Sequence, residues 1–110
     1  SGTLAPVNLN DGIAESLTNA CLEQKMVASA ALTVFWAAEV ERMYFRYGER
    51  GYRYLHLDAG HACQNLYLAA ESVGCGACGI AAFDDDKLNS VLGLDGVKEF
   101  AVYACAVGKK

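Results

Sequence analysis

The chain has 110 residues, a net charge of −4 and no basic run, so it is long enough for one domain and poorly suited to bind nucleic acid. No stretch reaches the roughly 18 uninterrupted apolar residues of a membrane span, and no charged leader precedes an apolar segment, so we expect neither a span nor a signal peptide. Five cysteines, an odd number scattered among apolar neighbours, favour reduced thiols in a cytoplasmic protein over a disulfide framework.

The composition is more apolar than a small domain requires. Ala, Val, Ile, Leu, Met, Phe, Trp, Cys and Gly account for 64 of the 110 residues. Globular proteins usually hold about 45–50 % of these residue types. The surplus predicts apolar faces that a second subunit or a missing segment covers.

The first half of the chain predicts a helix, a strand and another helix. After an irregular lead-in over residues 3–10, apolar residues recur at helical spacing from Asp11, a plausible N-cap, to Ala28. The continuous apolar run "ALTVFWAA" (31–38) is typical of a strand buried on both faces. Residues 39–51 then predict a short helix broken by Gly48 and Gly51.

The second half begins with the longest regular element, a helix over residues 52–73. It has one apolar stripe through Leu55, Ala59 and Leu66 and a second through Leu57 and Leu68, so it is central or packs against another subunit. The remaining segments predict a short buried strand, a helix with an acidic start and a central strand, over 77–83, 84–93 and 98–108 respectively. We see no domain boundary, so residues 1–110 form a single domain.

The stretch "GCGACG" (74–79) spells a dinucleotide fingerprint and a C-x-x-C motif at the same time. A fingerprint must follow a strand and open a helix, whereas these glycines close a helix and lead into a strand. A redox C-x-x-C normally lies at a helix N-terminus, and Cys75 and Cys78 follow a C-terminus. The sequence therefore favours a turn at Gly74 and two buried, unreactive thiols.

A metal site is a weaker alternative. His56 and His61, with Asp58 and Cys63 nearby, have no standard zinc spacing. Asp58 and His61 are three residues apart on the predicted helix and could form a hydrogen bond. A histidine satisfied within the helix is the simpler interpretation.

Linked motifs give the chain a specific resemblance. "RYGERGYRYLHLDAGHACQNLYLAAESVGCGACGIAAFDDDKLNSVLGLDG" (46–96) resembles the C-terminal half of the FMN-dependent nitroreductase family, in particular the streptolysin-type azole-forming dehydrogenases. The family pattern runs K-Y-G-x-R-G-Y-R-Y, then D-A-G-H and Q-N-L on a helix, then G-L-G and I-G-A-F. "CLEQKMVASAALTVFWAAEVERM" (21–43) resembles the preceding helix and strand.

This resemblance implies an α+β fold, with a central mixed sheet flanked by helices and a long central dimerisation helix. It also implies a homodimer with two FMN molecules at the dimer interface. The chain would be one half of the nitroreductase-like domain, and the N-terminal half, which carries an Arg/Ser motif for the FMN phosphate, would be another segment or a separate chain.

The resemblance also implies which residues form the site. The turn at Gly76 and the strand Gly79, Ile80, Ala81 and Ala82 would lie against the isoalloxazine ring, because small residues let the backbone come close. Ala81 and Ala82 replace residues that are often Glu-Gly or Gly-Ala in the family, so a side-chain hydrogen bond from Glu is lost.

The implied catalytic pair is Arg46 and Tyr47, where azole-forming relatives carry Lys-Tyr. Arginine is always protonated and is a poor general base, so Tyr47 is the candidate acid or proton relay and Arg46 its electrostatic neighbour.

The predicted function is hydride transfer between FMN and a small organic substrate, with NAD(P)H as the other partner. A non-catalytic, truncated dimerisation module that has lost flavin is the alternative, and a metal-binding protein is a more distant one.

Overall fold

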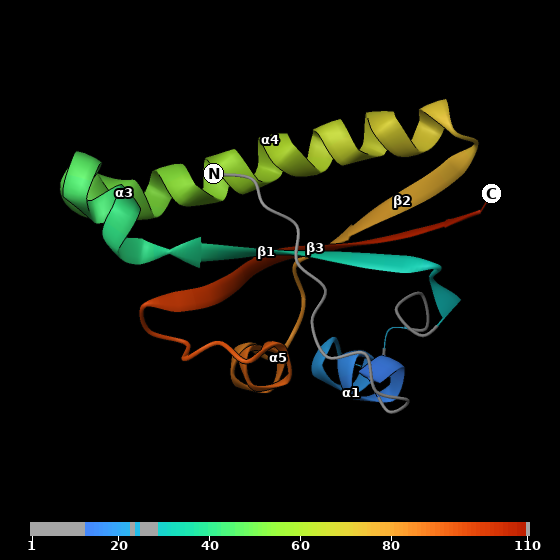
Figure 1. Cartoon of the computed structure of the whole chain (residues 1–110), viewed down its shortest axis with the longest axis horizontal. Coiled ribbons are helices and arrows are strands. Elements are labelled where there is room, and N and C mark those ends of the chain that lie inside the picture. The colour runs from blue at the N-terminus through green and yellow to red at the C-terminus, as the bar shows by residue number, and fades with distance from the viewer. Residues whose placement is uncertain (1–12, 23, 25–28, 110) are drawn as a thin grey trace.

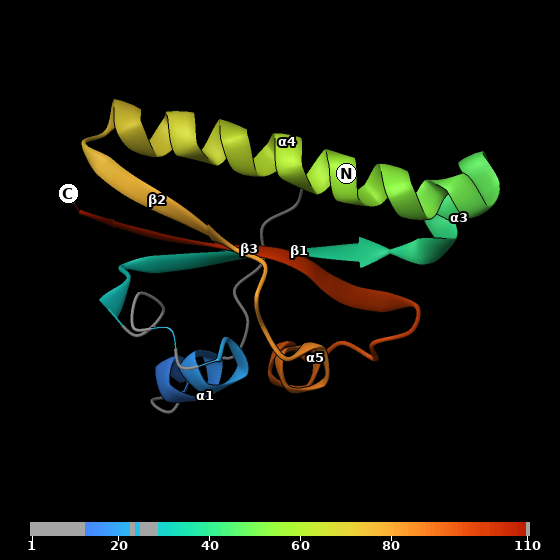
Figure 2. The same cartoon turned by 180° about the vertical axis from the view of Figure 1, so that it is seen from behind.

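The computed structural model describes residues 13–22, 24 and 29–109, and shows a sheet with helices on both faces (Figure 1). In chain order the elements are α1 (Ile13–Ala20), β1 (Leu32–Glu39), α3 (Val40–Tyr47), the short 3₁₀ helix η1 (Gly48–Arg50), α4 (Gly51–Ser72), β2 (Cys75–Ile80), α5 (Asp85–Leu92) and β3 (Glu99–Lys109). Helix α4 covers one face, and α1 and α5 lie together on the other (Figures 1 and 2). The predicted α+β class and element order are confirmed.

The sheet has the strand order β1-β3-β2, so β3 is the central strand, as its sequence predicts. Both pairings are antiparallel, and the β1–β3 register shifts between Trp36 and Ala37. The resemblance implies a mixed sheet, and any parallel strand would have to come from outside these three. The prediction that β1 is buried on both faces is wrong for the described part of the chain, because β1 is an edge strand without a fully buried residue.

Small side chains fill the core between the sheet and the α1–α5 layer. The buried residues there are Ala20, Cys21, Ile80, Leu88, Ala101, Ala104 and Ala106. Phe35 and Phe83 pack against both parts of this core. Because so many of the core residues are small, the two short helices lie close to the sheet.

Helix α4 agrees with the predicted helix over 52–73 to within one residue at each end. The buried residues of α4 lie on one side of the helix. They are Gly51, which packs against α3, and Leu55, Ala59, Cys63 and Ala70. The second predicted stripe is exposed, with Leu57 at 52 % and Leu68 at 62 % exposure. The helix is therefore apolar on a face that the described residues leave uncovered.

Glycines shape both ends of α4. Gly48 ends α3 with φ 62°, as predicted, but Gly51 begins α4 rather than breaking a helix. A Cβ on Gly51 would lie 2.8 Å from the carbonyl oxygen of Met43, so only glycine allows α3 this close to α4. At the other end, Gly74 has φ 77° in the turn to β2, which confirms the predicted turn.

The remaining boundaries differ modestly from the predictions. The predicted helix from Asp11 to Ala28 is observed as Ile13–Ala20, and both predicted end residues lie outside the described residues. The strand predicted over 77–83 is observed earlier, at Cys75–Ile80, so Ala81 and Ala82 follow it. Asp84 caps α5 by accepting the backbone N–H of Lys87 at 3.1 Å. Within the described ranges, no helix has both the length and the apolar character needed to cross a membrane.

Candidate functional site

The structure places the predicted site residues in two separate groups. Arg46 and Tyr47 end α3 at one end of the molecule, whereas the Gly76–Ala82 segment lies along and after β2 (Figures 1 and 2). The intervening helix α4 has 22 residues, which corresponds to about 33 Å. Strand β2 then runs back only part of that length. No hydrogen bond or ring contact joins the two groups among the described residues.

Tyr47 lies in an exposed cluster of arginines and aromatic rings. Its ring meets the Tyr54 ring edge-on at a centroid distance of 4.9 Å. The guanidinium of Arg46 lies 5.4 Å from the Tyr47 ring centroid, and Arg50 Nε donates to the Tyr54 hydroxyl at 3.1 Å. Two cationic groups therefore flank two phenol rings, an arrangement that can hold or relay a proton near an anionic reactant.

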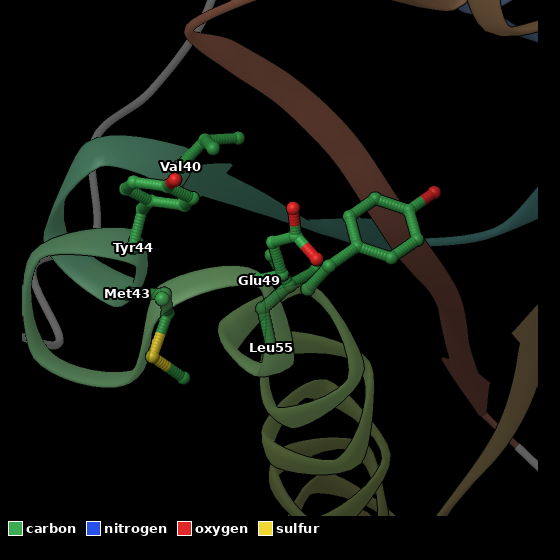
Figure 3. Close-up of a pocket in the computed structure, with 7 residues that line it drawn as sticks. Val40, Met43, Tyr44, Glu49 and Leu55 are labelled. Atoms are coloured by element: carbon green, nitrogen blue, oxygen red, sulfur yellow. The ribbon is translucent and has the colours of Figure 1, made fainter.

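An apolar pocket of about 280 Å³ opens beside this cluster, between α3 and the start of α4 (Figure 3). Its lining residues are Val40, Met43, Tyr44, Gly48, Glu49, Tyr52 and Leu55. Arg46 and Tyr47 do not line it. The sequence did not predict this pocket, because the pocket forms only when η1 folds α3 back onto α4.

The predicted cofactor-binding residues in and after β2 differ in their burial and contacts. Ile80 is 2 % exposed, and its side chain is in the core on the α1–α5 face. Ala81 and Ala82 are exposed, and the Ala82 carbonyl accepts from Gln24 Nε2 at 2.9 Å. Gly76, which faces Gly108 on β3, is half-buried.

Gly79 is held by two tyrosines that the sequence did not single out. Its backbone N–H donates to the Tyr67 hydroxyl at 2.6 Å. A Cβ at Gly79 would overlap the Tyr103 hydroxyl and lie 3.4 Å from that of Tyr67. The space beside Gly79 is therefore occupied by two side chains of the same chain, one from α4 and one from β3.

All five cysteines are free. Cys21, Cys63 and Cys105 are buried, and burial together with the neighbouring Cys63 thiol raises the pKa of Cys105 to about 11. Burial is also the main cause of the raised pKa of Tyr103, followed by its interactions with Cys63. The prediction that both C-x-x-C thiols are buried is wrong, because Cys78 is exposed and Cys75 is only half-buried.

The histidines bond within α4. His56 Nδ1 donates to the carbonyl oxygen of Tyr52 at 2.7 Å, and His61 Nδ1 to that of Leu57 at 2.8 Å. The hydrogen bond considered between Asp58 and His61 is replaced by this backbone contact. No three of the His, Cys, Asp and Glu side chains in the described ranges gather as metal ligands do, so the metal-binding alternative finds no support there.

The β2 segment can be tested for its fit to a flavin. A flavin ring offers a polar edge to backbone groups, and the exposed residues Ala81 and Ala82 provide such groups, apart from the Ala82 carbonyl, which Gln24 already occupies. A phosphate needs cationic or amide partners, and residues 75–84 carry no cation. These residues fit the ring of FMN, while its phosphate requires groups from elsewhere.

Comparisons with known proteins agree with this architecture. The model of the nitroreductase family matches residues 5–109. A relative from Methanocaldococcus jannaschii, named as a nitroreductase, is 36 % identical over 102 residues, which cover 93 % of this chain and 50 % of the relative.

Two solved structures share the fold. One, named as a nitroreductase from Anabaena variabilis, has a TM-score of 0.79 and 37 % identity, and the match covers 91 % of this chain and 20 % of that one. The other, an NADPH:FMN oxidoreductase from Vibrio harveyi complexed with NAD⁺, has a TM-score of 0.77 and 21 % identity over 93 % of this chain and 47 % of that one. The chain thus spans half or less of the length of each.

Proposed function

Because the chain belongs to the nitroreductase family, we propose that it is the C-terminal half of an FMN-dependent oxidoreductase. When bound, FMN supplies hydride transfer, and the protein orients the ring and the reactants. The substrate is a small organic molecule, and NAD(P)H is the other redox partner. The family match over residues 5–109 carries this proposal, and the Vibrio harveyi oxidoreductase named for NADPH and FMN supports it.

The ring site is assigned to the segment from Gly79 to Ala82, with Gly76 near the start of the same strand. Ala81 and Ala82 support this assignment because they are exposed and follow directly on a strand whose last residue is anchored in the core. The Gly79 amide is engaged by Tyr67 and the Ala82 carbonyl by Gln24, so the remaining backbone groups of Ala81 and Ala82 are those offered to a ligand.

The catalytic pair Arg46 and Tyr47 joins this site through a second subunit. In one copy the pair lies at the far end of α4 from the turn that leads into β2. A homodimer built along α4 places the α3–α4 corner of one copy near the β2 segment of the other. Arg46, in the place of the lysine of azole-forming relatives, favours nitroreductase-type hydride transfer over azoline oxidation, which needs a base.

Flavin titration of the native-length protein tests the proposal. We expect FMN to bind, to raise thermal stability and to be bleached by NADH or NADPH without oxygen, since a ligand that binds only the folded state stabilises it. Riboflavin serves as the control for the phosphate group. Absence of FMN binding, with folding intact, would favour the alternative of a dimerisation module that has lost flavin.

A further inference from the structure

Strand β2 is an edge strand of the described sheet, and one of its backbone amides is bound by a side chain instead of a neighbouring strand. Gly79 lies opposite Cys105 on β3, yet its N–H points away from β3 and donates to the Tyr67 hydroxyl at 2.6 Å. Alternate amides of an edge strand face outward in this way and need another partner. Here helix α4 provides that partner through a single phenol.

A second tyrosine, Tyr103, limits the size of the residue at position 79. The Tyr103 hydroxyl occupies the space that a Cβ at Gly79 would take. Tyr103 comes from the central strand β3, and its ring lies beside Trp36 of β1 at a centroid distance of 6.0 Å. Two phenols from two elements therefore meet at one glycine.

Ile80, the next residue, is held from the opposite face of the sheet. Ile80 is buried in the core with Cys21, Ala104 and Ala106. Gly79 is thus held on the α4 side and Ile80 on the α1–α5 side, immediately before the chain leaves the sheet at Ala81.

We propose that Tyr67 is a positioning residue for the flavin-ring site: by holding the Gly79 amide, its hydroxyl fixes the end of β2 and so the exposed Ala81–Ala82 backbone. This inference rests on the proposed function. It assigns Tyr67 no contact with the ring.

The test compares Tyr67→Phe with Ser72→Ala in the native-length protein. Tyr67→Phe removes only the acceptor of the Gly79 amide, whereas Ser72→Ala removes a hydroxyl on the same helix whose hydrogen bond, to the carbonyl oxygen of Ala69 at 2.6 Å, stays within α4. We expect Tyr67→Phe to speed hydrogen exchange of the Gly79 amide about tenfold and to raise the Kd for FMN by a similar factor, the size expected for one lost hydrogen bond. Riboflavin should lose affinity by the same factor, because the ring and not the phosphate is affected.

The measurements separate a positioning role of Tyr67 from a purely structural one. A purely structural tyrosine would lower thermal stability without changing the FMN Kd, and that result would overturn the inference while leaving the proposed function standing. Unchanged exchange at Gly79 would overturn it as well. If the wild-type protein binds no FMN, the proposed function fails and the inference falls with it.

Discussion

Ala81 is the residue at which the flavin proposal is most directly testable. Its side chain is exposed, so a larger side chain has room in the protein without ligand and meets an obstacle only when the ring is bound. We expect Ala81→Leu to fold normally and to gain much less thermal stability from FMN than the wild type. Overpacking typically costs about 1–3 kcal/mol, or roughly tenfold to a hundredfold in affinity.

Ala37→Leu is the matched control, because Ala37 is also exposed but lies on β1, away from the β2 segment. Thermal melts with and without FMN compare the three proteins. If Ala81→Leu gains as much from FMN as the control variant, the ring does not lie against Ala81.

We expect the C-x-x-C thiols to contribute little to the proposed chemistry. The Sγ of the exposed Cys78 lies 3.7 Å from the carbonyl oxygen of Gly79, a weak contact, and Cys75 lies at the other end of β2. We expect replacement of both by Ala to leave NAD(P)H oxidation within a few-fold of the wild-type rate. A folded double variant without turnover would show that one of these thiols takes part in the reaction.

The corner between α3 and α4 depends on one glycine in α4. A Cβ at Gly51 would lie 2.8 Å from the carbonyl oxygen of Met43, whereas nothing lies within 4 Å of a Cβ at Gly60 in the same helix. We expect Gly51→Ala to destabilise the protein by about 1–3 kcal/mol, because the clash outweighs the helix-propensity gain. Gly60→Ala should stabilise it by up to about 1 kcal/mol. Denaturant unfolding measures both, and equal effects of the two variants would contradict this packing.

The start of β3 depends on the ionised carboxylate of Asp95. Its Oδ1 accepts the backbone N–H groups of Val97, Lys98 and Glu99 at 2.8, 2.9 and 3.0 Å. These hydrogen bonds, with that from Glu99 first, lower the pKa of Asp95. A lowered carboxyl pKa stabilises the folded state above the pKa of the unfolded chain, and the stabilisation is lost as the pH falls through the folded value.

Asp95→Asn keeps an acceptor oxygen and removes the charge, so it isolates this effect. We expect the variant to be less stable than wild type at neutral pH and the difference to shrink as the pH falls below about 4, near the ordinary Asp pKa. Melting curves across that range measure the difference. A difference that stays constant with pH would mean that the charge is not responsible.

At the scale of elements, the spacing of apolar residues and the positions of glycines predicted the helices and turns that depend on local sequence. The helical spacing of Leu55 and Ala59 gave α4 to within a residue, and Gly74 gave its end. The burial of β1 was not predictable, because an apolar run does not say whether other elements cover both faces of the strand. The same holds for Tyr67 and Gly79, whose contact exists only after β2 folds back along α4.

Over the whole molecule, α4 presents apolar residues that no described part of the chain covers. Tyr52 is 63 % exposed, and Leu57 and Leu68 are 52 % and 62 % exposed. An exposed apolar stripe of this kind marks an interaction surface, and a second copy of the same helix satisfies it symmetrically. We therefore expect a homodimer or a larger complex built on α4.

Light scattering at high micromolar concentration tests this assembly, and Leu68→Glu should weaken it because a charge would be buried without a partner. Val97→Glu is the control, since Val97 is 76 % exposed but lies in the loop before β3. On the proposed function, such a dimer would unite the two halves of the site by bringing the Arg46–Tyr47 corner of one copy toward the β2 segment of the other. Leu68→Glu should therefore lower FMN affinity together with dimer formation. A monomeric wild type, or a monomeric variant that binds FMN as tightly as the wild type, would show that the site is complete within one copy.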